Sequence, residues 1–197
     1  MDQTEWNHNI HYHDLVLRSV PPRCRRALDV GCGAGLLARK LAARCDHVIA
    51  IDSDRDVLAR ARIVPGSSAR VTFVEGDIMT HPFPNGSFDL ITAVAALHHL
   101  PLSTALTRLR DLLNAGGILV IVGLYRSHTF LDYALAPAAV LASWALRSIR
   151  GFTDVAAPVK EPQETLPEIR GACSRLLPGA VLRRHLLFRY SVTWRKP

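Results

Sequence analysis

The stretch Leu28-Asp29-Val30-Gly31-Cys32-Gly33-Ala34-Gly35 decides the fold of this chain. It joins a short apolar segment, Ala27 to Val30, to a segment with the apolar spacing of a helix, whose inward face carries Leu36, Leu37, Leu41 and Ala42. Glycines at such a junction let the backbone turn sharply and let a ligand approach the main chain closely. A glycine loop between a strand and a helix is typical of nucleotide-binding α/β domains.

The chain around this loop alternates strand-like and helix-like segments. A helix is predicted within Asn7–Val20, ahead of the first strand, and two more are predicted over Asp54–Val64 and Leu102–Leu113. Further short apolar strands are expected at His47–Ile51, Val71–Val74, Phe88–Ala93 and Ile118–Val122. This alternation predicts a parallel sheet that helices cover on both faces.

The pattern changes beyond Gly123. An apolar helix is predicted over Thr129–Arg150 and another helix over Gln163–Leu177. The alternating runs Val181–Tyr190 and Val192–Arg195 predict a closing strand pair. We expect one domain over residues 1–197, with residues 1–22 as an N-terminal cap and residues 129–160 as an inserted helix or lid.

Composition favours an ordinary globular protein, because 49% of the 197 residues are hydrophobic and 21% are charged. The uncharged stretch Tyr133–Leu146 is shorter than the roughly 20 residues that span a bilayer, so no stable membrane insertion is expected. The four cysteines contain no C-x-x-C pair. They are expected to be free thiols in a reducing cytoplasm.

Positive charge gathers near the C-terminus. The net charge is +7, and the stretch Arg170–Pro197 holds seven Arg or Lys residues and no acid. Such a stretch can attract nucleic acid, but no nucleic-acid-binding module accompanies it. A solvated basic face is the favoured interpretation, and nucleic acid is not the expected partner.

The spacing of the glycines bears on the ligand. The loop reads G-x-G-x-G, and Leu36 stands where a dinucleotide fingerprint has Gly or Ala. A pyrophosphate would also rest on the N-terminus of the following helix. The loop therefore favours a nucleoside without phosphates over NAD.

Two acids follow the next two strands. Asp52 ends the second strand, 21 residues after Gly31, where a carboxylate meets ribose hydroxyls in nucleotide-binding sheets. Asp77 ends the third strand and could accept a hydrogen bond from an adenine amino group. Either acid alone could equally be a turn or helix-cap residue. Together with the glycine loop, they place three polar features at the ends of three successive strands.

At this point the chain resembles the class I methyltransferases that depend on S-adenosylmethionine (SAM), and most of all the short group called type 11. The resemblance runs in order and spacing from Ala27 to about Gly123. It rests on the glycine loop and on Ile51-Asp52-Ser53, Gly76-Asp77-Ile78, Pro82-Phe83-Pro84-Asn85-Gly86-Ser87-Phe88-Asp89 and Leu113-Asn114-Ala115-Gly116-Gly117.

The resemblance implies a Rossmann-like, doubly wound α/β fold with a seven-stranded sheet, mostly parallel with an antiparallel last strand. It implies SAM as the cofactor. Its methionine part would be bordered by Asp29, Gly31, Cys32, Gly33 and Gly35. Asp52, with Ser53 beside it, would hold the ribose, and Asp77 with Ile78 the adenine. Ala93 and Val94 would lie near the sulfonium.

Histidines are numerous, nine in all. His98 and His99 follow the fourth strand, close to the expected methyl donor, and either could be a general base. Alternatively, one of them only caps the turn before Pro101. His8 and His13 belong to an N-terminal segment that could fold over the site, although a cap or an exposed polar face is the favoured interpretation. No metal site is expected from His8, His11 and His13, because no Cys or acidic partner has ligand-like spacing.

The sequence thus predicts an enzyme that methylates a small molecule, a metabolite or a natural-product intermediate. An RNA methyltransferase that uses the basic C-terminal stretch and a non-catalytic SAM-binding protein remain as alternatives. The apolar segment Thr129–Arg150 hints at an apolar or aromatic acceptor, and a helix packed in the core explains it equally well.

Overall fold

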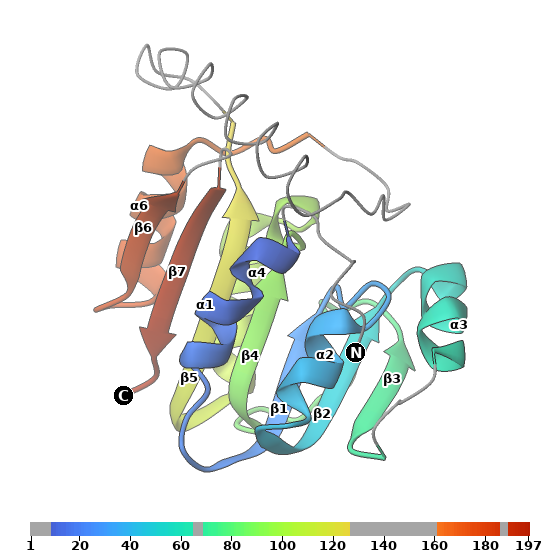
Figure 1. Ribbon diagram of the computed structural model, residues 1–197. Helices are drawn as coiled ribbons and strands as arrows, with labels where there is room; N and C mark the ends of the chain where they lie inside the picture. The colour runs from blue at the N-terminus through green and yellow to red at the C-terminus, as the bar shows by residue number, and fades with distance from the viewer. Residues whose placement is uncertain (1–8, 65–68, 127–160, 186–188) are drawn as a thin grey trace.

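A seven-stranded sheet with the strand order β3-β2-β1-β4-β5-β7-β6 forms the centre of the protein. The computed structural model describes residues 9–64, 69–126, 161–185 and 189–197 (Figure 1). The strands are β1 (Cys24–Val30), β2 (Cys45–Asp52), β3 (Val71–Glu75), β4 (Phe88–Val94), β5 (Leu113–Leu124), β6 (Val181–His185) and β7 (Arg189–Arg195). The helices are η1 (Ile10–Tyr12), α1 (His13–Arg18), α2 (Leu36–Leu41), α3 (Arg55–Ile63), η2 (Leu97–His99), α4 (Leu102–Leu112) and α6 (Leu166–Leu176).

Strand direction confirms the expected fold class. β1 pairs in parallel with both β2 and β4, and the parallel pairing continues to β3 on one side and β5 on the other. β7 runs antiparallel to both of its neighbours, β5 and β6. The strand order reverses between β1 and β4, the kind of switch point at which doubly wound sheets bind ligands.

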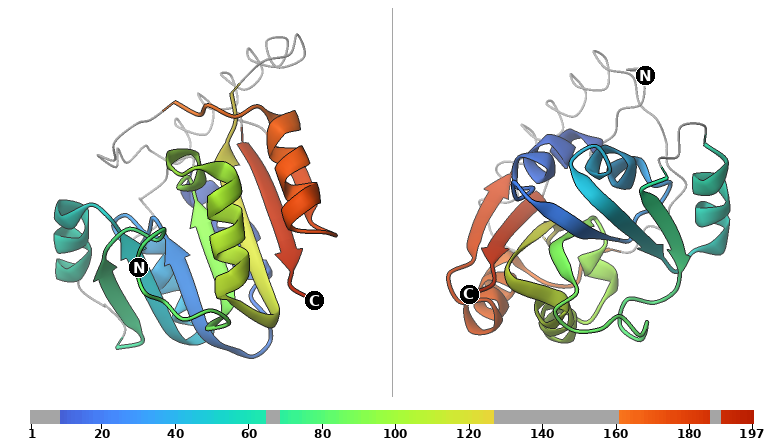
Figure 2. Two further views of the ribbon diagram at one scale, coloured as in Figure 1. Left: turned by 180° about the vertical axis from the view of Figure 1, so that it is seen from behind. Right: turned by 90° about the horizontal axis from the view of Figure 1, so that it is seen from below.

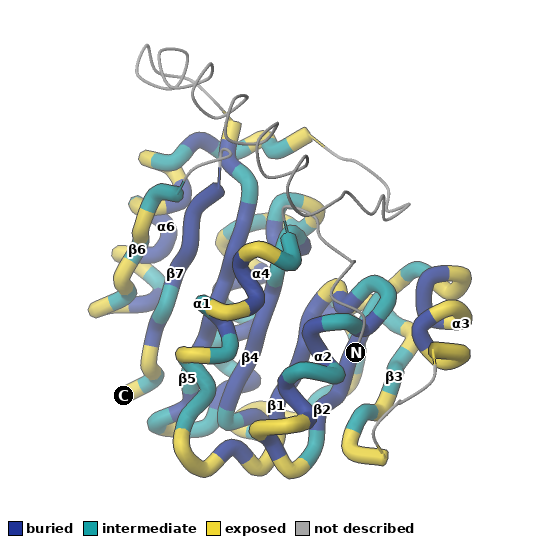
Figure 3. Tube along the Cα trace, in the orientation of Figure 1, coloured by how far each residue is buried: buried dark blue, intermediate teal, exposed yellow. Residues whose placement is uncertain are grey.

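Helices cover the two faces of the sheet, as the views from behind and below show (Figure 2). Side chains alternate along each strand, so Ala27 and Leu28 of β1 enter different cores. Ala27 packs on the face covered by α1 and α2, and Leu28 on the face covered by α4 and α6. The central strands are accordingly the most buried part of the chain (Figure 3).

Two boundaries differ from the sequence prediction. The expected break at Asn114–Gly117 lies inside β5, whose residue Leu113 already pairs with Phe88 of β4. The expected break between the closing strands, at Ser191, lies inside β7, and β6 ends earlier, at His185. The hydroxyl of Ser191 lies 2.7 Å from Nε2 of His185, so this polar residue has a partner within the pair of strands.

The predicted helix Thr129–Arg150, and the lid over residues 129–160, lie outside the described residues. In the described part of the chain, no helix is both long enough and apolar enough to span a membrane.

Candidate functional site

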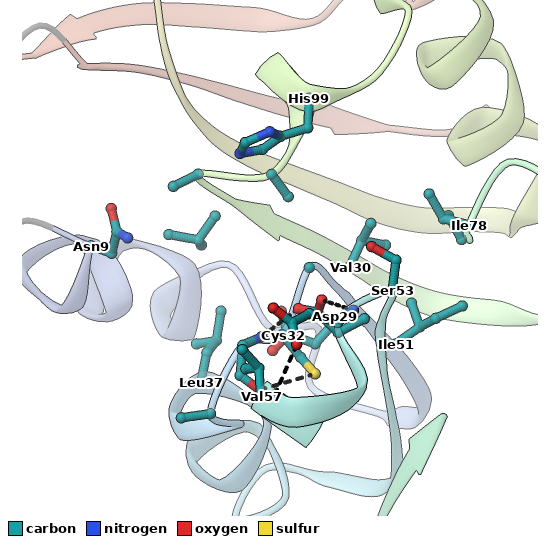
Figure 4. A pocket seen from close by; sticks show the side chains of 18 of the residues that line it. Asn9, Asp29, Val30, Cys32, Leu37, Ile51, Ser53, Val57, Ile78 and His99 are labelled. Carbon is teal, nitrogen blue, oxygen red and sulfur yellow. Dashed lines mark hydrogen bonds between the residues drawn. The ribbon is translucent and has the colours of Figure 1, made fainter. Parts of the chain in front are cut away.

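A cavity of about 590 Å³ opens at the carboxyl ends of β1, β2 and β4, beside the switch point of the sheet. Its volume lies in the range of small-molecule sites, roughly 300–1,000 Å³. Figure 4 shows Asp29 and Cys32 on one side, with Asn9 and His99 across the space from them. The walls come from the loop after β1, the turns after β2, β3 and β4, and the N-terminal segment.

The glycine loop takes a shape that other residues would not tolerate. Gly31, Gly33 and Gly35 all have positive φ, at 66°, 53° and 75°. A Cβ on Gly31 would lie 2.5 Å from Cβ of Ala96, so the loop also approaches the turn after β4 too closely for a side chain. A Cβ on Gly33 would meet no atom within 4 Å, and Gly33 lines the cavity. The loop thus leaves room for a ligand against its backbone.

Asp29 is the most deeply buried acid of the site, 2% exposed near the end of β1. Its Oδ1 accepts a hydrogen bond of 2.8 Å from the Thr92 hydroxyl, while Oδ2 is buried with no hydrogen-bond partner among the described residues. Burial raises the pKa of the Asp29 carboxyl to about 7; the Thr92 hydroxyl opposes this shift, the Asp52 carboxylate adds to it, and the backbone N–H of Ala38 opposes it to a smaller extent. An unpartnered buried carboxylate oxygen in a cavity wall is suited to a cationic group of a ligand.

Asp52 joins two parts of the site. Its Oδ2 accepts the backbone N–H of Gly33 at 2.8 Å, and its Oδ1 accepts that of Asp54 at 3.0 Å. Because a carboxylate has about four lone-pair sites, two remain for a ligand. Asp54 caps α3 through the N–H groups of Asp56 and Val57. One side chain therefore fixes both the glycine loop and the start of α3.

Asp77 and Ile78, in the turn after β3, also line the cavity. Oδ1 of Asp77 accepts the backbone N–H of Met79 at 2.9 Å, which shapes the turn after β3. Ile78 is 5% exposed and lines the cavity. The two residues therefore offer a carboxylate beside an apolar surface.

The N-terminal segment contributes Asn9, Ile10 and His13 to the wall. His13 is only 5% exposed, and its Nδ1 is buried without a hydrogen-bond partner among the described residues. His13 therefore does not belong to an exposed polar face, although it is the C-cap residue of η1, as the alternative of a cap expected. Burial lowers the pKa of His13 to about 4, with Lys40 acting in the same direction and Asp14 against it. The ring is therefore neutral near pH 7, and it can either donate a hydrogen bond to a ligand or accept one from it.

The turn after β4 carries Ala95, whose φ of 53° is in the left-handed region. That conformation costs a non-glycine residue about 1–2 kcal/mol. The hydrogen bond from its N–H to the carbonyl of Val122, 2.7 Å long, helps to hold it there. Ala95 lines the cavity between Val94 and Ala96, so the strain lies where a ligand would be bound. The sequence does not reveal this position, because an alanine gives no signal of positive φ.

The two neighbouring histidines after β4 differ in position. His99 is exposed and lines the cavity, whereas His98 is half-buried and lies outside the wall. Their rings lie 4.1 Å apart between centroids, tilted by 41°. Of these two histidines, His99 is therefore the one that a ligand in the cavity would contact.

Most of the residues that the sequence pointed to for a cofactor do meet on the wall. These are Asp29, Gly31, Cys32, Gly33, Asp52, Ser53, Asp77, Ile78 and Val94. Two others are not part of the wall. Gly35 caps α2 with its left-handed backbone, and Ala93 is fully buried in the core against the α4 and α6 face. Within the described ranges, no group of three or more His, Cys, Asp or Glu side chains is arranged for a metal.

Known proteins resemble the chain along its whole length. The family model described as a methyltransferase domain matches residues 28–121. An uncharacterized methyltransferase of Mycobacterium tuberculosis is 42% identical, and the match covers all of both chains. A ubiquinone biosynthesis O-methyltransferase of Xanthomonas euvesicatoria is 33% identical over 141 residues, which are 68% of this chain and 58% of that relative.

Solved structures share the fold. A SAM-dependent methyltransferase from Mesorhizobium loti has a TM-score of 0.66 at 18% identity, over 93% of this chain and 96% of that one. The N-methyltransferase NodS from Bradyrhizobium japonicum, in complex with S-adenosylhomocysteine (SAH), has a TM-score of 0.65 at 20% identity, over 97% of this chain and 89% of that one. Together with the cavity and the glycine loop, these matches identify the chain as a member of the class I SAM-dependent methyltransferases.

Proposed function

We propose that this enzyme transfers the methyl group of SAM to a small molecule, a metabolite or a natural-product intermediate. The observation that carries the proposal is the character of the cavity away from its acids. Asn9, His13 and His99 supply polar groups there, and Ile10 and Leu100 supply apolar surface. A few polar groups in an apolar wall are typical of small-molecule sites. The Xanthomonas relative, an O-methyltransferase of ubiquinone biosynthesis, supports the same class of acceptor.

The residues at the other end of the cavity suit the cofactor. Oδ2 of Asp29 would accept a hydrogen bond from the ammonium of the methionine part, and the backbone of Gly31 to Gly33 would border it. Asp52, next to Ser53, would accept the ribose hydroxyls, and Asp77 with Ile78 would hold the adenine. Val94 would lie near the sulfonium. The orphaned Oδ2 and the side-chain-free face of Gly33 support this assignment.

When bound, SAM supplies a methyl group activated by a sulfonium. The methyl group would pass to the acceptor as its bond to sulfur breaks, and SAH would remain. The protein aligns the acceptor and excludes water. His99 would take a proton from an acceptor that carries one, such as a hydroxyl or an acidic carbon.

Three of the basic side chains near the C-terminus, those of Arg189, Arg195 and Lys196, give an RNA acceptor little support. Arg189 is 8% exposed and is therefore unavailable to phosphates. Arg195 donates to the carbonyl of Gly116, and Lys196 donates to those of Arg110 and Leu113, near the start of β5. That end of the sheet is opposite to the carboxyl ends that form the cavity. To guide RNA to the cavity, these side chains would have to lie at the carboxyl ends of the strands.

Transfer of label from SAM tests the proposal. We expect SAM labelled on its methyl group to label compounds in the small-molecule fraction of a cell extract, and not the RNA fraction. A heat-inactivated sample of the same protein is the matched control. Label that enters RNA would establish the alternative acceptor. SAM binding with no labelled product in any fraction would favour a non-catalytic protein.

The pH dependence of SAH binding tests the place of Asp29. Because the pKa of the buried carboxyl is about 7, its charged form is lost as pH falls through that value. We expect SAH to bind about tenfold more weakly at pH 6 than at pH 8, by calorimetry. Asp29→Asn should bind weakly at both values, because the amide keeps an oxygen for Thr92 and carries no charge. An equal slope in the variant would contradict the assignment.

We also propose a cytoplasmic location. The four cysteines are all buried and free, including Cys24 and Cys45, which stand opposite one another in neighbouring strands. Adjacent free thiols are usual where the surroundings are reducing.

A further inference from the structure

Arg189 is a buried cation beside the N-terminal segment. It is the first residue of β7, where it pairs with Leu124 at the carboxyl end of β5, and it is 8% exposed. Burial lowers the pKa of its guanidinium to about 10 and Tyr12 opposes the shift, so the group is charged at neutral pH. Among the described residues, no carboxylate forms an ion pair with it.

The described hydrogen bond of this guanidinium goes to Asn9. Nη2 of Arg189 donates to Oδ1 of Asn9 at 2.9 Å, between residues that are 180 positions apart in the chain. Nε and Nη1 have no hydrogen-bond partner among the described residues. Burying a charge with so few partners lowers the stability of the folded protein. A contribution to stability therefore does not explain why Arg189 contacts Asn9.

The residues around this bond connect the N-terminal segment to the last two strands. Tyr12 is 5% exposed, and its ring centroid lies 5.4 Å from that of His185 in β6. Figure 1 shows α1, which follows directly, in front of the part of the sheet that contains β5. The N-terminal segment thus has one side against the C-terminal strands.

The other side of the same segment faces the cavity. Asn9, Ile10 and His13 line it, whereas Arg189 does not. Arg189 is therefore linked to this wall through its hydrogen bond with Asn9, without lining the cavity itself.

We propose that Arg189 is a positioning residue for methyl transfer. By holding the Asn9 amide, it fixes the wall that Asn9, Ile10 and His13 present to the ligands. This role rests on the proposed function only in that the wall faces the bound cofactor.

A positioning role predicts that replacing Arg189 changes ligand affinity without lowering stability, which a purely structural role does not predict. Met has nearly the length of Arg but neither charge nor hydrogen-bond donors. Replacing a buried, poorly paired cation by a packed apolar side chain is often neutral or stabilising. Arg189→Met should therefore keep or raise Tm while it loosens the wall. A residue that acted only through the fold would lower stability and affinity together.

We test this with the full chain and SAH. Arg189→Met is expected to weaken SAH binding about fivefold or more by calorimetry, with Tm no lower than in the parent. The amides of residues 10–18 should also lose part of the exchange protection that SAH gives them. Arg195→Met is the matched control, because Arg195 is an exposed arginine at the other end of β7, and it should keep the affinity of the parent. Arg189→Lys, which keeps the charge and one donor head, should restore part of the affinity.

Asn9→Ala is the second variant that tests the proposal. It should weaken SAH binding by at least a similar factor, and the double variant should be no weaker than Asn9→Ala alone, since both changes break the bond between Arg189 and Asn9. A folded Arg189→Met with SAH affinity within about twofold of the parent would overturn the proposal, as would additive losses. If Arg189→Met does not fold, unchanged affinity in Asn9→Ala overturns it. Failure of the proposed function would show differently, as a parent that binds SAH and methylates no small molecule.

Discussion

Replacing Asp52 with alanine is expected to weaken SAH binding by about tenfold or more. Hydrogen bonds to a charged group contribute about 1.5–3 kcal/mol each, and the ribose would offer two. The same change removes the acceptor for the N–H groups of Gly33 and Asp54, so the glycine loop loses its tie to the end of β2. Both effects act in the same direction, and calorimetry with SAH measures their sum.

Two further variants separate these effects. Asp56→Ala removes an exposed carboxylate from the first turn of α3, outside the cavity wall, and should bind SAH as the parent does. Asp52→Asn keeps one acceptor oxygen for the loop and loses the charge, so its affinity should lie between those of the parent and Asp52→Ala. A folded Asp52→Ala with the affinity of the parent would show that the ribose lies elsewhere.

His99→Ala is expected to lower turnover by about 10²–10⁴ when the acceptor loses a proton, because removal of a general base has an effect of this size. SAH affinity should change little, since the proton belongs to the acceptor. An amine acceptor attacks through its own lone pair, and His99 would then only orient it, so the loss would be milder. Steady-state turnover with the acceptor from the labelling experiment, beside SAH calorimetry, measures both quantities.

His98→Ala is the companion variant. His98 lies outside the cavity wall and contacts the ring of His99, which lines it. Replacing His98 should therefore lower turnover far less than replacing His99. Full turnover in both variants would exclude the pair from the mechanism, and alignment alone would explain the rate. A larger loss in His98→Ala would reverse the two assignments.

Local sequence spacing was enough to predict the glycine loop and the acids near it. A glycine loop between a strand and a helix, and acids at the ends of parallel strands, are fixed by short segments of chain that meet at one edge of the sheet. Asp29, Asp52 and Asp77 line one cavity for that reason. The parallel strands were predictable in the same way, from apolar runs of the right length.

Other features depend on contacts that local patterns do not reveal. His13 is buried because the N-terminal segment packs against the domain, and no periodicity in Trp6–His13 announces that contact. The bond between Arg189 and Asn9 joins residues near the two ends of the chain. His98 and His99 are adjacent in a short 3-10 turn, and only the path of that turn decides which of them reaches the cavity.

A crystal structure of the protein with SAH tests the central claim most directly. Both ribose hydroxyls are expected within hydrogen-bond distance of the Asp52 carboxylate, with the amino group at Oδ2 of Asp29 and the adenine beside Ile78. The sulfur should then face the part of the cavity bounded by Asn9, His13 and His99. SAH bound with its ribose away from Asp52, or outside this cavity, would contradict the account.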